Sequence, residues 1–145
     1  MTPSDPESSS RDLSGLSRLH AGEKDYPSEP SASLLESFPN RYPHRDYRIR
    51  FHCPEFTSLC PVTGQPDFAS IDLEYVAAAR CLESKSLKLY LFAFRNQGTF
   101  GEDIVNRILE DCVACLAPKW MKVTGRFSAR GGISIEVTAE HGHLG

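Results

Sequence analysis

The sequence has no hydrophobic run long enough to cross a membrane and no excess of basic residues. None of its apolar stretches approaches the roughly 18 residues that a membrane-spanning helix needs. Asp and Glu number 19 against 16 Lys and Arg, which gives a net charge of -3. A protein built to hold nucleic acid carries surplus Lys and Arg for phosphates, so this balance argues against direct nucleic-acid binding. It leaves room for a local basic pocket for a small phosphorylated ligand.

The start of the chain is equally poor in apolar residues. Residues 1–11 contain no hydrophobic segment of the secretory kind, so we expect a cytoplasmic protein. Thiols stay reduced in that compartment, and five cysteines are an odd number, so a disulfide framework is a poor interpretation. At least one of the five can be a working thiol, although buried structural cysteines are commoner.

Two familiar binding motifs are also missing. The sequence has neither a Gly-x-Gly-x-x-Gly nor a Walker sequence, so a nucleotide is not held in the Rossmann or P-loop manner. Cys112 and Cys115 have the spacing of a metal or redox pair. However, Cys112 belongs to an apolar helical stripe, and no second Cys/His pair has zinc-site spacing. We therefore expect no metal site.

The composition divides the chain into unequal parts. Residues 1–40 are rich in Ser, Pro, Asp and Glu and lack sustained apolar periodicity, which predicts a disordered tail. Patterned sequence follows, and we expect one domain over residues 41–140 and a terminal tail over residues 141–145.

The patterned part begins with two strands. Apolar and polar residues alternate over residues 47–52 and again over residues 71–75, which is the period of a half-buried strand. Residues 54–67 between them are punctuated by proline and glycine. This segment is too irregular for a regular element, and its length points to a functional loop.

Two helices and two further strands complete the pattern. Residues 84–95 and 104–116 carry apolar stripes at helical spacing, and residues 121–127 and 133–137 alternate again. The order strand, strand, helix, helix, strand, strand predicts an α+β domain, with two helices on one face of an antiparallel four-stranded sheet. The two open edges of such a sheet need protection, which favours a homo-oligomer.

The loop around Cys60 carries the first chemical signal. A thiolate is intrinsically nucleophilic, and a loop held by prolines can present it without burying it. Asp67, seven residues later, can return across the turn to donate a proton, for which it has to be protonated near neutral pH. The same residues also fit a small buried cysteine and a turn-forming aspartate.

The start of the first predicted helix carries a second signal. Lys85 and Lys88 are neighbours on this helix, and Ser84 and Ser86 lie at its start. Cationic side chains together with free amides at a helix N-terminus suit a phosphate. A capped helix with solvated lysines fits the same residues.

A carboxylate at the start of the second helix gives the third signal. Glu102 can accept two hydrogens from an amidine-like edge, such as the N1–H and exocyclic amine of guanine. Together with Thr99 it also fits a capping box, and the spacing does not choose between the two roles.

Taken together, these segments resemble a known enzyme family. Residues 53–68, Cys-Pro-Glu-Phe-Thr-Ser-Leu-Cys-Pro-Val-Thr-Gly-Gln-Pro-Asp-Phe, match the catalytic loop of the NADPH-dependent 7-cyano-7-deazaguanine reductases in their short, single-module form. Residues 83–90, Glu-Ser-Lys-Ser-Leu-Lys-Leu-Tyr, match the signature motif of that family, and Arg-Gly-Gly-Ile at residues 130–133 matches its last turn. The likeness spans about residues 47–137.

The resemblance implies a fold and a reaction. Members have the tunnelling fold (T-fold), and their subunits form stacked rings with active sites between subunits. They are nitrile reductases of queuosine tRNA modification, which convert 7-cyano-7-deazaguanine to the aminomethyl product with two NADPH and no metal. Cys60 would form a thioimide with the nitrile, and Asp67 would donate the proton.

The resemblance also implies binding residues. Glu102 matches the glutamate that holds the guanine-like edge. Substrate contacts match Leu82, Glu83 and Ser84. NADPH contacts match Lys85, Ser86, Lys88 and Arg130.

One position departs from the family pattern. The family usually has histidine immediately before the glutamate, on the substrate side of the site, and here that residue is Gly101. We expect this substitution to slow turnover without abolishing thioimide formation. The family member with a protective disulfide has a cysteine where this chain has Ile104, so no such regulation is expected.

Two alternatives stay open from the sequence. One is another T-fold protein, either a purine or pterin handler or a relative that transfers an amine to the same nitrile on tRNA. The other is a purine-binding protein that kept the pocket and lost turnover. A reactive Cys60 that substrate protects from labelling would favour an enzyme.

Overall fold

The structure is a computed structural model that describes residues 26–144. Its elements follow in the order η1 (Ala32–Leu34), β1 (Ser37–Pro39), β2 (Arg48–Leu59), β3 (Pro66–Val76), β4 (Arg80–Leu82), α2 (Ser84–Phe92), η2 (Ala93–Asn96), α3 (Gly101–Leu116), β5 (Trp120–Arg130) and β6 (Ile133–Gly142). The predicted order is confirmed, with one short strand pair added to it.

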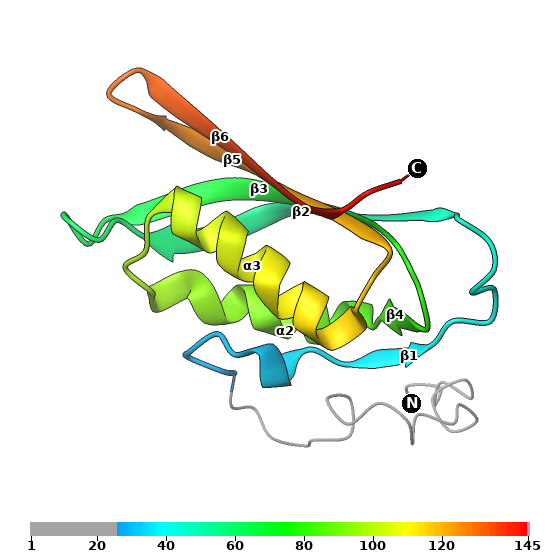
Figure 1. Cartoon of the computed structure of the whole chain (residues 1–145). Coiled ribbons are helices and arrows are strands. Elements are labelled where there is room, and N and C mark those ends of the chain that lie inside the picture. The colour runs from blue at the N-terminus through cyan, green and yellow to red at the C-terminus, as the bar shows by residue number, and fades with distance from the viewer. Residues whose placement is uncertain (1–25, 145) are drawn as a thin grey trace, which may run out of the picture.

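The main sheet has the strand order β2-β3-β5-β6, and every neighbouring pair is antiparallel. Both helices lie on the same face of this sheet (Figure 1). The α+β class with two helices on one face is therefore confirmed. Within the chain, β2 and β6 are the edge strands.

The core lies between the helices and the alternate residues of the strands. On β3, Ile71, Leu73 and Tyr75 are almost fully buried, while Glu74 between them is not. The longer helix, α3, buries its apolar stripe against this layer. Each such side chain contributes roughly 1.5–3 kcal/mol by leaving water, so the stripe fixes where α3 begins and ends on the sheet.

The predicted loop over residues 54–67 was too long. Strand β2 continues to Leu59 and β3 begins at Pro66, so the connection shrinks to residues 60–65. A register shift between Cys53 and Phe56 explains the difference. Pro54 has no N–H to give to a ladder, and a bulge lets the strand pass through it.

The predicted boundary at residue 40 also lies too late. Residues 37–39 form β1, which pairs with β4, and Leu35 is buried in the core. Asn40 is held as well, because its side-chain amide donates to the Ala78 carbonyl at 2.9 Å. The rest of the predicted tail, residues 1–25, lies outside the described residues. At the other end, β6 reaches Gly142 and so enters the predicted terminal tail.

The predicted capping box is wrong. Helix α3 begins at Gly101 with Phe100 at the N-cap, and no side chain caps it. Glu102 therefore does not serve as a cap. Helix α2 is capped instead, because Glu83 accepts hydrogen bonds at 2.7 Å from the amides of both Lys85 and Ser86.

The sheet face away from the helices is polar. His52, Asp72, Arg126 and Glu136 form a row of ion pairs that crosses all four strands. Burial opposes the charge of Asp72, but hydrogen bonds from His52 and Arg126 outweigh it and hold the pKa of this carboxyl below its usual value.

Candidate active site

The connection between β2 and β3 is a closed turn that carries Cys60. The Cys60 N–H donates to the Gln65 carbonyl at 2.8 Å, and the Gly64 N–H donates to the Cys60 carbonyl at 2.9 Å. Gly64 has a φ of 72°, which glycine adopts without strain. These bonds leave the Cys60 side chain half-exposed at the end of the strand, as a reactive thiol requires.

Thr63 sits in the same turn and acts on the thiol. Its hydroxyl is the largest influence that lowers the pKa of Cys60, followed by the N–H groups of Thr63 and Val62. Burial and the Asp67 charge oppose this effect but do not cancel it. Hydrogen bonds to a thiolate favour the charged, nucleophilic form. The sequence analysis missed Thr63, although a hydroxyl residue within a cysteine turn is a usable signal.

Asp67 returns across the turn, as predicted, but it has a partner. Nε of Arg130 lies 2.6 Å from Oδ1 of Asp67. Arg130 ends β5 at the tip of the β5–β6 hairpin, so the structure joins a predicted cofactor residue to the predicted proton donor. Sequence spacing gives no sign of this contact.

The start of α3 lies beside the Cys60 turn. Leu59 exchanges backbone hydrogen bonds with Gln97 at 3.0 Å and Thr99 at 3.3 Å, which ties the segment before α3 to the end of β2. Glu102 follows in the first turn of α3 and is exposed. Among the described residues its carboxylate has no hydrogen-bonding or ionic partner. It is therefore available to accept hydrogen bonds from a ligand.

Gly101 is packed closely against a core ring. A Cβ atom at this position would lie 2.9 Å from Cε2 of Phe127, which is closer than ordinary contact. Phe127 itself is 9% exposed. The Phe127 ring therefore occupies the space that the Cβ atom of a larger residue at position 101 would need.

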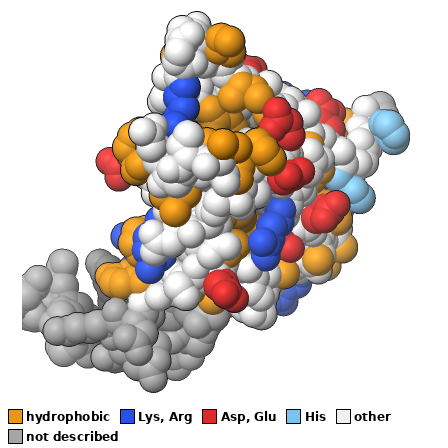
Figure 2. All heavy atoms as spheres, turned by 90° about the vertical axis from the view of Figure 1, so that its left-hand side faces the viewer, with side chains coloured by type: hydrophobic (Ala, Val, Ile, Leu, Met, Phe, Trp, Pro, Cys, Tyr) orange, Lys and Arg blue, Asp and Glu red, His pale blue; other side chains and the backbone are white. Residues whose placement is uncertain are grey.

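This end of the molecule also exposes apolar side chains. Val62 is 81% exposed and Ile133 is 76% exposed, although both are aliphatic. Figure 2 faces this end and shows hydrophobic side chains gathered between charged ones. The hairpin tip extends past the helices (Figure 1), and the exposed Ile133 stands there at the start of β6.

The residues predicted near the signature motif lie around the start of α2. Leu82 and Ser86 are buried, and the Ser86 hydroxyl accepts from the Glu36 N–H and donates to the Glu83 carbonyl. The backbone amides of Lys85 and Ser86 were predicted to be free, but both donate hydrogen bonds to the Glu83 carboxylate. Lys88 and Ser84 are exposed and remain available to a ligand.

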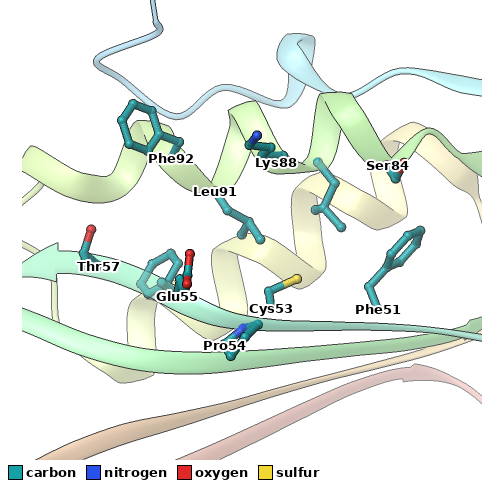
Figure 3. Close-up of a pocket in the computed structure, with 11 residues that line it drawn as sticks. Phe51, Cys53, Pro54, Glu55, Thr57, Ser84, Lys88, Leu91 and Phe92 are labelled. Carbon is teal, nitrogen blue, oxygen red and sulfur yellow. The ribbon is translucent and has the colours of Figure 1, made fainter.

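A pocket of about 410 Å³ lies between α2 and β2. Ser84 and Lys88 line it from the helix, and Phe51 and Cys53 line it from the strand (Figure 3). Burial, followed by the Asp72 charge, raises the pKa of the Cys53 thiol, so this cysteine is the less reactive one. The sequence analysis did not connect the residues of β2 with those of α2.

The structure thus gathers the predicted site residues into two groups. Asp67, Glu102 and Arg130 belong to segments that adjoin the Cys60 turn. Residues 82–88 lie at the start of α2, beside β4.

Three further features of the sequence concern Cys112, metal-ligating side chains and membrane-spanning helices. Burial raises the pKa of Cys112 far above its usual value, and this residue belongs to the core. No group of metal-ligating side chains occurs among residues 26–144. Within the same range, no helix is both long and apolar enough to cross a membrane.

Comparisons with known proteins agree with the fold and the motifs. The NADPH-dependent 7-cyano-7-deazaguanine reductase of Anaeromyxobacter sp. (strain K) is 59% identical over 116 residues, which cover 80% of this chain and 94% of that one. The enzyme of the same name from Neisseria meningitidis serogroup B is 50% identical over 134 residues, covering 92% and 85% of the two chains.

A solved structure shares the architecture. The archaeosine synthase QueF-Like in its apo form matches with a TM-score of 0.60 and 25% identity, over 68% of this chain and 95% of that chain. The T-fold expected from the sequence is confirmed by this neighbour. The family model described as QueF-like protein matches residues 66–144, which is more than half of the chain. The chain therefore belongs to the QueF-like protein family.

Proposed function

We propose that this chain reduces the nitrile of 7-cyano-7-deazaguanine to an aminomethyl group with two NADPH, as part of queuosine tRNA modification. The observation that carries the proposal is the half-exposed Cys60, whose turn lowers its pKa, with Asp67 on the returning strand opposite Ser58. Relatives that are 50–59% identical carry this activity in their names. Free cysteines at all five positions suit a reducing cytosol.

The residues support a covalent first step. The Cys60 thiolate adds to the nitrile carbon, a C–S bond forms, and an electron pair of the triple bond moves to nitrogen. Asp67, a carboxylate paired with Arg130 in the free chain, first takes a proton from solvent and passes it to the nitrogen, which gives a thioimide. NADPH, when bound, supplies one hydride per molecule. Overall, two hydrides and two protons convert the nitrile to the amine, and Cys60 leaves again as a thiolate.

Recognition of the substrate is assigned to Glu102. Its exposed carboxylate stands in the first turn of α3, where helix amides also favour negative charge. Two oxygens can accept the N1–H and the exocyclic amine of a guanine-like edge. We assign Gly101, with its neighbouring Phe127 ring, to the wall beside that base. At the start of α2 we assign Leu82, Glu83 and Ser84 to substrate contact, with the buried Leu82 acting through its backbone.

The cofactor is assigned to the cationic side chains. Lys88 is exposed at the pocket between α2 and β2, Lys85 is half-exposed beside it, and Arg130 is 39% exposed at the hairpin tip. Such side chains suit the phosphates of NADPH. Ser86 fits this role less well, because its hydroxyl is buried and bonded within the chain.

We further propose that copies of the chain complete the site for one another in stacked rings. The predicted site residues fall into two groups, and among residues 26–144 the outer edges of β2 and β6 have no partner strand in the main sheet. Pairing such edges between subunits would protect them. The exposed Val62 and Ile133 beside Cys60 would be covered by the same contact.

The experiment that tests the reaction follows NADPH oxidation with 7-cyano-7-deazaguanine, alongside intact mass of protein mixed with substrate alone. We expect two NADPH oxidised per nitrile and a covalent adduct that Cys60→Ala abolishes. An adduct without NADPH oxidation would favour the second candidate, a purine-binding or amine-transferring T-fold protein. The structural similarity to an archaeosine synthase is the observation that supports this second candidate function.

Mixing two inactive variants tests the shared site. Cys60→Ala changes the turn between β2 and β3, and Lys88→Ala changes the pocket between α2 and β2. If sites lie between copies, mixed oligomers formed by joint refolding should regain about a quarter of the activity, because one site in four receives two intact halves. No regained activity would place each site within a single chain.

A further inference from the structure

The guanidinium of Arg130 holds three consecutive residues of the catalytic turn. Besides the 2.6 Å contact of its Nε with Asp67, its Nη1 donates to Oε1 of Gln65 at 3.3 Å. Its Nη2 donates to the Pro66 carbonyl. One side chain from the hairpin tip therefore contacts residues 65–67 in succession.

These contacts lie beyond the end of the ladder between β3 and β5. That pairing starts at Ala69 and Phe127, so residues 65–67 and Arg130 lie outside it. On the other side, Pro66 and Asp67 stay paired with Leu59 and Ser58 of β2, which fixes their backbone. Arg130 adds the side-chain bonds that join this segment to the hairpin tip. The direction of the Asp67 carboxylate therefore depends on Arg130, whereas the path of the backbone does not.

The contacts contribute more to geometry than to stability. The Arg130 side chain is 39% exposed and that of Asp67 is 24% exposed, and ion pairs in such surroundings stabilise a fold little. A planar guanidinium, however, fixes the direction of each bond that it makes. Arg130 bonds the side-chain oxygen Oε1 of Gln65, and the backbone carbonyl of the same Gln65 accepts from the Cys60 N–H.

We propose that Arg130 is a positioning residue for the covalent step, which directs the Asp67 carboxylate relative to Cys60 before any cofactor binds. The inference rests on the proposed function and adds to it, since the family resemblance assigns Arg130 only to NADPH. The two roles are compatible. A guanidinium has five N–H donors, of which three point at the turn, so others remain for a phosphate.

The test measures adduct formation with 7-cyano-7-deazaguanine and no NADPH, where a residue that serves only the cofactor has no effect. Arg130→Lys keeps the charge and loses the planar fork, and Arg130→Ala loses both. We expect each to slow adduct formation by about tenfold or more, because a small misplacement of reacting groups is costly. Arg126→Lys is the matched control, since Arg126 lies on the same strand and pairs with Asp72 instead. It should leave the rate unchanged.

A double-mutant cycle distinguishes positioning from a general structural defect. In an Asp67→Asn background, Arg130→Ala should slow the residual adduct formation much less than it does in the unmodified chain. An undiminished effect there, or normal adduct formation in both Arg130 variants, would overturn the inference alone. Absence of adduct in the unmodified chain would overturn the proposed function, and this inference with it.

Discussion

The two ends of α2 are built in opposite ways. At its start, side chains are committed to partners within the chain: Leu82 is buried, and Glu83 caps the helix. At the other end, beyond η2, the residues assigned to chemistry are only partly covered. Cys60 and Asp67 are half-buried, and Glu102 is exposed.

This difference separates what holds the fold from what performs the reaction. A carboxylate that accepts two backbone amides contributes to stability, whereas one without a partner in the chain, such as Glu102, is available to a ligand. Changes at the Cys60 end should therefore alter chemistry with little effect on stability. Changes at the capped end should lower stability, in addition to their effect on the contacts assigned there to substrate and NADPH.

The largest expected effect belongs to Cys60. Cys60→Ala should abolish the covalent adduct and lower NADPH oxidation by about four orders of magnitude or more, as loss of a nucleophile does in other enzymes. The melting temperature should stay nearly unchanged, because the side chain is only partly buried. Intact mass, turnover and thermal melting measure the three quantities.

Cys53→Ala is the matched control for that variant. Cys53 is also partly buried and lines the pocket, but its pKa is raised rather than lowered. It should retain the adduct and most of the activity. An adduct that survives Cys60→Ala and disappears in Cys53→Ala would move the chemistry to the pocket beside α2.

Gly101→His tests whether the missing histidine limits turnover. The new Cβ would meet the Phe127 ring at 2.9 Å, so we expect a loss of about 1–3 kcal/mol in the free energy of unfolding, as overpacked cores show. Phe127→Leu should recover part of this loss. Urea denaturation of the two single variants and the double variant measures the coupling.

The same variants test the kinetic hypothesis. The double variant should oxidise NADPH faster than Phe127→Leu alone, while single-turnover adduct formation should stay the same. Equal steady-state rates would contradict the hypothesis that glycine at position 101 slows turnover. Purely additive stabilities would show that the ring does not restrict position 101.

The fold was predictable in the strands and helices that bury one face, where apolar residues recur at a regular spacing. The alternation at Ile71, Leu73 and Tyr75 and the apolar stripe of α3 gave the element order, because burial on one side imposes a period on the sequence. Strand β2 beyond Pro54 was missed, since a bulge carries the strand past a residue that usually ends one. Strand β1 was missed because its partner, β4, is distant in the chain.

The site was predictable by residue and not by arrangement. The spacing made Cys60 and Asp67 candidates, and the family resemblance supplied the roles predicted for them; the turn that holds Cys60 is built from local bonds. The contact between Asp67 and Arg130 joins residues far apart in the chain, so the sequence pattern does not predict it. The capping box failed for a different reason. The spacing of Thr99 and Glu102 suits it, but the chain enters α3 through Phe100 and leaves Thr99 outside the cap.

Glu83→Ala tests the capped end and should cost about 1 kcal/mol, because the amides of Lys85 and Ser86 lose their acceptor. Thermal or urea denaturation measures this loss. Glu83→Asp, which keeps a capping carboxylate, should lose less. If this more stable variant nevertheless binds substrate much more weakly, the capped end shares in recognition, and the contrast between the two ends is smaller than the structure indicates.

The smallest expected effect concerns the thiol itself. Thr63→Val removes the hydroxyl that contributes most to lowering the pKa of Cys60 and keeps the shape of the side chain. A hydrogen-bond donor favours the thiolate, so its loss raises the pKa, and the pH midpoint of alkylation moves upward. Near neutral pH the rate of labelling by iodoacetamide should fall, by about tenfold at most.

Thr63→Ser keeps the hydroxyl and should retain the original midpoint. The other half-buried thiols interfere little, because burial is the first cause that raises the pKa of both Cys53 and Cys115. Cys60→Ala supplies the remaining background. Since labelling needs neither substrate nor NADPH, it reports on the turn alone. An unmoved midpoint in Thr63→Val would mean that the N–H groups of Val62 and Thr63 suffice, and that the backbone of the turn rather than its side chain activates Cys60.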